Sequence, residues 1–311
     1  MTGLNSADAV AASQVPAPGE LVLDHVAHFI PHIDSASAAL EQLGFTLTPF
    51  SAQSHRAEPG GPLVPAGSGN RCAMFERGFV EFLTPTADTP IANQMRTAIK
   101  RYVGAHLVAF GTGAADSDHV RIEKAGFNPL PVVALQRQIG TETGEGTARF
   151  TVVRVPPGTM AEGRIQYCQH HTPELLWQPR WTGHANHAAG LAGVILRVAN
   201  AQEAARRYAR YTGLLAEVSG SVWRLATPRG YLIFTDRDTL HRRLDITPPT
   251  LPWIAGTVVE SNNITATGDF LRNSGIAVHV LGSQRLLVKL PPAVGGIMIF
   301  EPRKSGVLNF D

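Results

Sequence analysis

Cysteine is scarce in this sequence, which has two such residues, Cys72 and Cys168, among 311. Two thiols so far apart provide neither a disulfide framework nor a paired-cysteine metal motif. Such cysteine usage is typical of a reducing compartment, so we expect a cytoplasmic protein.

Charge and long apolar runs are scarce as well. Charged residues make up 17% of the chain, the formal net charge is +2, and the arginines are scattered. A nucleic-acid-binding surface usually carries a basic stripe, so we expect no nucleic-acid partner. No apolar run approaches the roughly 20 residues of a membrane span, and the start of the chain lacks the basic and apolar regions of a secretory signal. We therefore expect a soluble protein without a membrane partner, and a flexible tail over residues 1–20.

One pattern, a buried strand followed by a helix that a glycine ends, occurs four times. The clearest copy begins Leu23-Asp24-His25-Val26-Ala27-His28-Phe29-Ile30 and ends at Gly44. From the matching first-strand residue to the glycine the copies span 19, 20, 20 and 19 residues, from His25 to Gly44, His106 to Gly126, Gly193 to Gly213 and Gly256 to Gly275. A spacing this constant indicates four related units.

Each unit is predicted to have a βαβββ order in a mixed α+β fold, and two such units can curl into a half-open barrel with a cleft between them. The first two units are assigned to a domain over residues 21–177 and the last two to a domain over 191–303, with a linker over 178–190 and a tail over 304–311. We expect Asp34, Asp116 and Asn200 to cap helices, a strand over 45–50, and loops over 59–69 and 140–146.

Polar side chains on otherwise apolar strands mark the candidate site, because burying them unpaired costs about 1–3 kcal/mol each. Units one and two place His25 and His106 where units three and four have Gly193 and Gly256, and Glu81 lies inside an apolar last strand. Two imidazoles and a carboxylate from separate strands suit a divalent ion such as Zn²⁺, Mn²⁺, Fe²⁺ or Ni²⁺. The alternatives are a polar pocket without metal, and purely structural side chains.

The four units, the Asp-His-Val start and the strand Phe79-Val80-Glu81-Phe82-Leu83 resemble the vicinal oxygen chelate superfamily. The run Cys168-Gln169-His170-His171-Thr172-Pro173-Glu174-Leu175-Leu176-Trp177-Gln178-Pro179, followed by His184-Ala185-Asn186, is similar to its glyoxalase-like branch. That superfamily pairs a first-strand histidine and a last-strand glutamate from each of two units around one metal. The resemblance therefore implies His25 and Glu81 from unit one, and His106 from unit two, as ligands.

The fourth ligand position departs from that pattern. Aligning Thr84-Pro85 with Thr172-Pro173 puts Gln169 opposite Glu81, whereas aligning Gly78 with Gly163 puts Gln166 there. No carboxylate occupies the position in either alignment, and His170 is the preferred ligand because it is the best donor on the inward side with Gln166. The rivals Gln169 and His171 share the opposite side of the strand, and they are assigned, with Glu174, to substrate binding.

The function that this resemblance implies is that of a metal-dependent lyase or isomerase acting on a small oxygenated substrate in the cleft of the first domain. Glu81 is the catalytic proton carrier if it is not bound to the metal. A metal-free small-molecule-binding protein is the alternative. A ring-cleaving dioxygenase is less favoured, because related four-unit dioxygenases place their metal in the second half, where Gly193 and Gly256 offer no ligand. A homodimer is left open as the oligomeric state.

Overall fold

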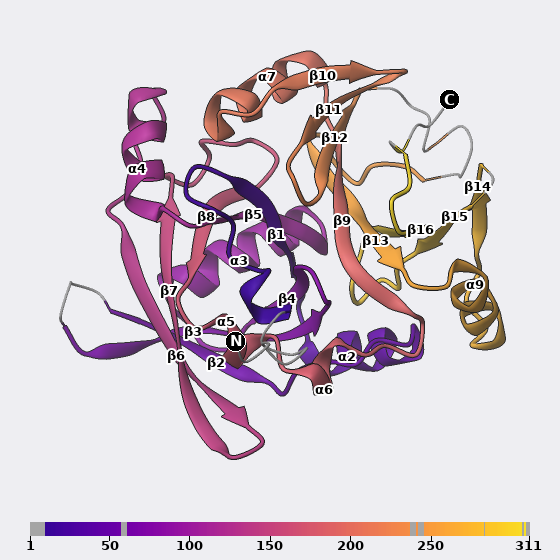
Figure 1. The fold of residues 1–311 in the computed structure, drawn as a ribbon, viewed down its shortest axis with the longest axis horizontal. Helices are drawn as coiled ribbons and strands as arrows, with labels where there is room; N and C mark the ends of the chain where they lie inside the picture. The colour runs from indigo at the N-terminus through magenta and orange to yellow at the C-terminus, as the bar shows by residue number, and fades with distance from the viewer. Residues whose placement is uncertain are drawn as a thin grey trace, which may run out of the picture.

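One order of elements, a strand, a helix and then three strands, repeats along the chain (Figure 1). This computed structural model describes residues 10–56, 61–236, 241, 246–282, 284–306 and 308. The first unit consists of β1 (Leu21–Phe29), α2 (Ile33–Gln42), β2 (Ser51–Arg56), β3 (Leu63–Met74) and β4 (Phe79–Pro85). Helix α3 (Pro90–Arg101) leads to the second unit, which consists of β5 (Gly104–Thr112), α4 (Ala115–Lys124), β6 (Val133–Thr141), β7 (Gly144–Arg154) and β8 (Arg164–His170).

The second half of the chain repeats this order after two short helices, α5 (Pro173–Leu176) and α6 (Pro179–Thr182). The third unit consists of β9 (Ala188–Arg197), α7 (Ala201–Thr212), β10 (Ala216–Ser219), β11 (Val222–Ala226) and β12 (Tyr231–Thr235). The fourth consists of β13 (Trp253–Ser261), α9 (Ile264–Asn273), β14 (His279–Leu281), β15 (Arg285–Lys289) and β16 (Ile297–Pro302). The mixed α+β class expected from the sequence is confirmed.

The first strands of neighbouring units pair with each other. β1 pairs antiparallel with β5, and β9 with β13, and each of the four also pairs in parallel with the last strand of its own unit. Units one and two therefore build one half of the sheet, and units three and four the other. The halves meet where β5 and β13 pair at Ala105 and Ile254. The division into domains over residues 21–177 and 191–303 stays a prediction, because one sheet runs through both halves of the described chain.

As expected, a glycine follows the helix of each unit. The chain leaves the helix there through a left-handed backbone conformation, which favours glycine. Gly44, Gly126, Gly213 and Gly275 all have positive φ, between 75° and 88°, a region that residues with a Cβ rarely adopt. At the N-terminal end of α7, the Asn200 side chain caps the helix by accepting a hydrogen bond from the Glu203 N–H (3.0 Å).

Asp34 and Asp116 are not N-caps, contrary to the expectation. The cap positions of α2 and α4 are His32 and Ala114, and neither has a side-chain cap bond. Both carboxylates lie instead in the first turn of their helices. Negative charge there is still favourable, because the N-terminal end of a helix carries a partial positive charge.

The strands of the first unit also differ from the sequence pattern. Residues 45–50 form no strand, the second strand is β2, and β3 occupies most of the segment expected as a loop over 59–69. Pro65 is accommodated because this end of β3 pairs with β2 alone, while pairing with β4 begins at Ser68. Residues 140–146, also expected as a loop, form the end of the β6–β7 hairpin.

Helix α3 was not expected, and it packs against the sheet of the first half. The Thr89 hydroxyl caps it by accepting from the Ala92 N–H (3.1 Å), and Pro90 occupies the first turn. Its buried Met95 packs in a cluster with Phe29 and Leu107 from the sheet. The sheet face that carries the cleft of the first half is therefore partly covered by α3.

The described part of the expected N-terminal tail packs against the rest of the protein. Gln14 is fully buried, its amide donates to the Glu76 carbonyl (2.7 Å), and its side-chain oxygen accepts from the Gly78 N–H (3.2 Å). Residues 1–9 of that tail lie outside the described residues, as do 307 and 309–311 of the expected C-terminal tail.

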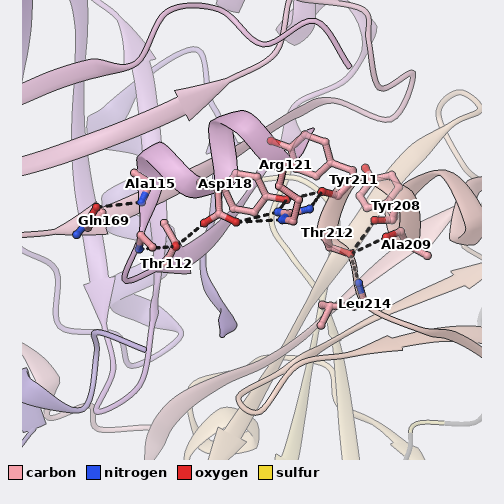
Figure 2. A network of polar contacts seen from close by, with 12 residues as sticks. Thr112, Ala115, Asp118, Arg121, Gln169, Tyr208, Ala209, Tyr211, Thr212 and Leu214 are labelled. Carbon is pink, nitrogen blue, oxygen red and sulfur yellow. Dashed lines mark hydrogen bonds and ion pairs between the residues drawn. The ribbon is translucent and has the colours of Figure 1, made fainter. Parts of the chain in front are cut away.

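A polar network joins the two halves between α4 and α7 (Figure 2). The Arg121 guanidinium and the Tyr167 hydroxyl each donate to the Tyr211 carbonyl at 2.7 Å. Asp118 accepts from Arg121 and so holds its orientation. The halves are thereby fixed relative to each other by more than strand pairing. None of the helices in the described residues is long and apolar enough to cross a membrane.

Candidate active site

A cleft of about 210 Å³ opens in the first half of the sheet. Its walls come from strands of both units of that half, β1 to β8. The polar and thiol side chains that line it are His25, Gln53, Ser54, Asn70, Glu81, Gln136, Arg137, Arg154, Arg164, Gln166, Cys168 and His170. Leu83, Leu107, Leu135, Phe150 and Val152 are among the apolar residues between them.

Strand register explains why His25 and Glu81 meet in this cleft. Successive side chains of a strand point to opposite faces, and His25 of β1 pairs with Phe79 of β4, whose ring it stacks on at 4.5 Å between centroids. Glu81 lies two residues further along β4 and therefore on the same face. The structure brings these two predicted site residues together.

A buried carboxylate, Asp24, links two imidazoles behind the cleft. Asp24 is fully buried and accepts from His25 Nδ1 (2.6 Å) and from His170 Nε2 (3.0 and 3.1 Å). It lies at a β-bulge, since the β1–β5 pairing skips it between Leu23 and His25. A Cβ at Gly111 of β5 would lie 2.9 Å from the Val22 side chain and 3.4 Å from the Asp24 carboxylate, so the glycine lets β1 and β5 approach closely beside Asp24. Asp24 can therefore reach across β5 to His170 on β8.

The charges of this group follow from burial and pairing. Burial alone would raise the pKa of Asp24, but the charge of His170 and hydrogen bonds from both imidazoles outweigh it and hold the pKa well below its ordinary value. Burial would likewise lower the pKa of His170, but the Asp24 carboxylate raises it to about 10. At neutral pH His170 is thus a buried cation, paired with the Asp24 anion.

Glu81 is held by amide donors. Asn70 of β3 donates a short hydrogen bond to it, and Gln53 donates at 3.5 Å. The Asn70 side-chain oxygen accepts in turn from Arg137 (3.2 Å). The carboxylate is therefore positioned in the cleft by a chain of hydrogen bonds that ends on a guanidinium.

His106 does not lie in the cleft, contrary to the prediction that it matches His25. Its Nε2 donates to the Tyr102 carbonyl (2.8 Å), and its ring stacks on Tyr102 at 4.0 Å. Burial lowers the pKa of His106 to about 4, so it is neutral. Leu107 lines the cleft in its place.

The register shows why the match was one residue off. His25 pairs with Phe79, the first residue of the last strand of its unit, and the residue paired with the corresponding Arg164 is Leu107. The β1–β5 pairing skips His106 at a bulge. The spacing to the glycine does not distinguish the two residues, because Gly193 also pairs with the first residue of its last strand and precedes Gly213 by 20 residues, as His106 precedes Gly126.

Gln166 occupies the position that corresponds to Glu81. Both lie two residues after the start of their last strand and face the cleft. His170 also borders the cleft, but its Nε2 is turned to Asp24. The His170 ring packs edge-on against Trp177 at 5.0 Å, and the buried Trp177 packs in turn on Phe79. Trp177 is thus packed within the first half, in a cluster with Phe79 and Leu176.

The three residues assigned to substrate binding do not line this cleft. Gln169 bonds the Ala115 N–H and the Gly113 carbonyl (both 3.1 Å) at the start of α4, on the other face of β8 (Figure 2). His171 is exposed and bonds the Thr151 hydroxyl (2.8 Å). Glu174 is exposed in α5. Gln169 and His171 were considered as rivals of His170 on the opposite side of the strand, and both lie outside the cleft.

The donor set does not fit the four-ligand metal site that the resemblance implies. The four positions hold His25, Glu81, Leu107 and Gln166, and a leucine has no donor atom. Among the described residues, a group of donors close enough to hold an ion is Asp24, Cys168 and His170, whose ligand atoms lie within 4.8 Å of one another. An ion there would have to displace the proton of His170 and compete for the carboxylate that both imidazoles use.

The chain belongs to the glyoxalase-like domain family, which matches residues 23–212, and its fold is of the vicinal oxygen chelate type. No curated protein matches the sequence. The chain is similar in structure to a hypothetical protein from Staphylococcus aureus, with a TM-score of 0.62, 11% identity, and 91% of this chain and 99% of that chain covered.

Two further solved structures share the fold. One is a mutant of 4-hydroxymandelate synthase from Streptomyces coelicolor, with a TM-score of 0.51, 13% identity, and 92% of this chain and 95% of that chain covered. The other is a xylose isomerase-like TIM barrel/4-hydroxyphenylpyruvate dioxygenase fusion protein, with a TM-score of 0.58 and 9% identity; the alignment covers 95% of this chain and 51% of that one. Identities this low bear on the fold alone.

Proposed function

We propose that the first half binds a small oxygenated substrate in its cleft and transfers a proton at a carbon beside a carbonyl, the lyase or isomerase class of reaction. The observation that carries this proposal is the Asp24–His25 pair. Asp24 accepts from His25 Nδ1, which fixes the tautomer in which Nε2 has the free lone pair. No partner for Nε2 is found among the described residues, and His25 borders the cleft.

His25 acts in this proposal as the general base, with Asp24 as its positioning residue. A buried carboxylate behind an imidazole orients the ring and stabilises the imidazolium that forms. Glu81 is the second proton carrier on the same face of the sheet, held by Asn70. A carbon acid bound between β1 and β4 would then lie within reach of both groups.

No step of this reaction is assigned to a metal, because Leu107 and Gln166 replace two of the four donors that the superfamily uses. The same replacement weakens the dioxygenase reading, which the names of two structural neighbours suggest. An iron site of two histidines and one carboxylate needs a second imidazole in the cleft. The nearby His170 uses its Nε2 for Asp24.

A metal-free binding protein is the second candidate. It is favoured by the same two residues, since Leu107 and Gln166 leave a cleft that can enclose a ligand without holding an ion. The two candidates differ in whether the bound molecule exchanges a proton.

Proton exchange in D₂O, followed by NMR, tests the proposal. The substrates are 4-methyl-2-oxopentanoate and hydroxyacetone, which both have an acidic C–H beside a carbonyl. We expect exchange with the wild-type protein and a rate roughly 10²–10⁴-fold lower in His25→Gln, the usual contribution of a general base. His171→Gln is the matched control, because that histidine is exposed and lies outside the cleft.

Each other outcome has a definite meaning. Binding of either compound without exchange would favour the binding protein. Exchange that a chelator abolishes and Zn²⁺ or Mn²⁺ restores would replace the proposal with a metal-dependent reaction. Equal loss in His25→Gln and His171→Gln would refute the role of His25.

A further inference from the structure

Two arginines at one side of the cleft form no ion pair with any acid in the part of the chain that the structure describes. Arg154 of β7 and Arg164 of β8 both border the cleft. Arg154 pairs in register with Gln166, and Arg164 lies two residues before Gln166 on the same face. Paired strands lie about 5 Å apart and alternate residues about 7 Å apart, so both guanidiniums extend from one small area of the wall.

Neither guanidinium is neutralised within the part of the chain that the structure describes. The buried Arg154 Nε has no hydrogen-bond partner there. Arg164 donates to the neutral amide of Gln94 (2.9 Å) and packs over the Phe29 ring at 5.3 Å. Burial lowers the pKa of both arginines, and the charge of Arg154 lowers that of Arg164 further. Two half-buried cations in contact with the same cavity favour an anion between them.

The acids near the cleft are already engaged. Asp24 binds the two imidazoles. Glu81 lies on β4, and its bond with Asn70 connects it to Arg137, a third guanidinium. Among the described residues, no acid forms an ion pair with Arg154 or Arg164, so an anionic ligand can balance their charge.

We infer that Arg154 and Arg164 bind the oxyanion group of the substrate, which identifies the substrate class as a small 2-oxo or 2-hydroxy carboxylate. Guanidinium groups bind carboxylates through two parallel hydrogen bonds. Leu83, Leu107 and Leu135 leave an apolar space for a short side chain. A phosphate ester has the same anionic chemistry, and the test distinguishes the two.

The position of these arginines relative to His25 suits this class. His25 pairs with Ala109 of β5, and Ala109 pairs with Gln166 of β8. Two strand spacings separate the backbones of His25 and Gln166 by about 10 Å, and both side chains border the cleft. A carboxylate at Arg154 and Arg164 would direct the neighbouring carbons of a short molecule toward His25. This inference thus deepens the proposed proton transfer and rests on it for the reacting end.

Calorimetric binding of 4-methyl-2-oxopentanoate, compared with its uncharged methyl ester and with butyl phosphate, tests the inference without requiring turnover. We expect the ester to bind roughly tenfold or more weakly than the acid. Arg154→Gln and Arg164→Gln are each expected to weaken binding of the acid roughly ten- to a hundredfold. Arg154→Lys should recover part of the loss, since it restores the charge but not the fork of donors.

Arg149→Gln is the matched control, because Arg149 lies on the same strand as Arg154 but is exposed and outside the cleft. It should bind the acid like the wild-type protein. Tighter binding of butyl phosphate than of the acid would support the oxyanion site and assign it to phosphate esters. Equal binding of ester and acid would overturn the inference. So would equal loss in Arg149→Gln and Arg154→Gln, or no binding of either anion at roughly 10 mM.

The two proposals fail separately. His25→Gln is expected to bind the acid within about threefold of wild type, because an interaction made with the reacting carbon contributes mainly to the transition state. Arginine-dependent binding without proton exchange would leave the anion site standing and refute the proposed reaction. Exchange that is insensitive to both arginine variants would do the reverse.

Discussion

The two halves of the molecule share one strand arrangement but carry different side chains at the equivalent positions. The residue paired with the start of the last strand is His25 or Leu107 in the first half, and Gly193 or Gly256 in the second. A Cβ at Gly193 would lie 2.5 Å from the Tyr231 ring, and one at Gly256 would lie 1.9 Å from the Ile297 carbonyl. Neighbouring atoms thus fill the space that an imidazole takes in the first half.

The position of Glu81 shows the same contrast. Counted from the start of the last strand, the second half has Ile233 and Ile299 there, and both are fully buried in an apolar cluster. The nearby Tyr231 hydroxyl donates to Glu301, which also accepts from Arg285. Tyr231, Glu301 and Arg285 thus bond one another, whereas the polar groups around Glu81 in the first half face a cavity. One fold therefore carries a solid core in one half and a candidate site in the other.

Replacing Asp24 should lower the stability of the first half more than the other substitutions below. The second half has Ala192 and Ala255 at the matching position, before Gly193 and Gly256. Asp24→Ala would leave the His170 cation buried without its partner, a change that costs about 3–5 kcal/mol of unfolding free energy. The additional change His170→Leu removes the cation as well and should restore most of that loss. Urea denaturation measures both, and a double variant no more stable than the single one would show that the ion pair is not the cause.

The same pair predicts how stability depends on pH. The pKa of His170 is raised from 6.5 to about 10 in the folded protein, so the stabilisation is complete below pH 6.5 and declines as the pH rises toward 10. The difference in unfolding free energy between wild type and Asp24→Ala should therefore shrink over this range. Denaturation at pH 6, 8 and 9.5 gives the measurement. A difference that stays constant would mean that His170 does not hold its proton.

Gly193→Ala should destabilise the second half although it adds one methyl group. Tyr231 cannot move away easily, because it is buried and bonded to Glu301, and such overpacking costs about 1–3 kcal/mol. Gly140→Ala in the first half is the control, because an added Cβ there meets nothing within 4 Å. Thermal unfolding of both variants checks the contrast. An unchanged melting temperature of Gly193→Ala would mean that the Tyr231 ring leaves room beside Gly193 for a methyl group.

Two substitutions in the first half supply the metal donors that Leu107 and Gln166 replace. Leu107→His together with Gln166→Glu gives the first half the four donors that the superfamily uses. We expect this variant to retain about one equivalent of Zn²⁺ after dialysis, and the further change His25→Ala to abolish retention. Elemental analysis of the three proteins, wild type included, measures it. Retention that survives His25→Ala would locate the ion elsewhere.

Gln169→Ala should have the smallest effect. Its amide bonds backbone groups at the start of α4, on the face of β8 away from the cleft, so the loss should be about 1 kcal/mol of stability. Ligand binding should not change. Gln166→Ala, at the position facing the cleft, is the comparison, and an equal effect of both on ligand affinity would contradict the assigned faces.

The fold class and part of the site could be read from the sequence because their signals are local. The glycines after each helix require a left-handed backbone wherever the units repeat, and Glu81 is conspicuous inside an apolar strand. Thr89 and Pro90 also carried a recognisable start signal for α3. The pairing of strands is not local, and it puts Leu107, not His106, opposite the first residue of the last strand. Asp24 was overlooked because an acid beside a histidine gives no sign that it reaches a third strand.

Trp177 gives the protein a built-in optical reporter. Its indole packs at 5.0 Å from the His170 ring and rests on Phe79, the residue stacked beneath His25. Protonated imidazole quenches indole emission, so the fluorescence of this residue responds to the charge of His170 and to displacement of the wall on which the substrate would rest. The chain has four tryptophans, and a Trp177→Phe variant isolates the contribution of the one that contacts His170 without any added label.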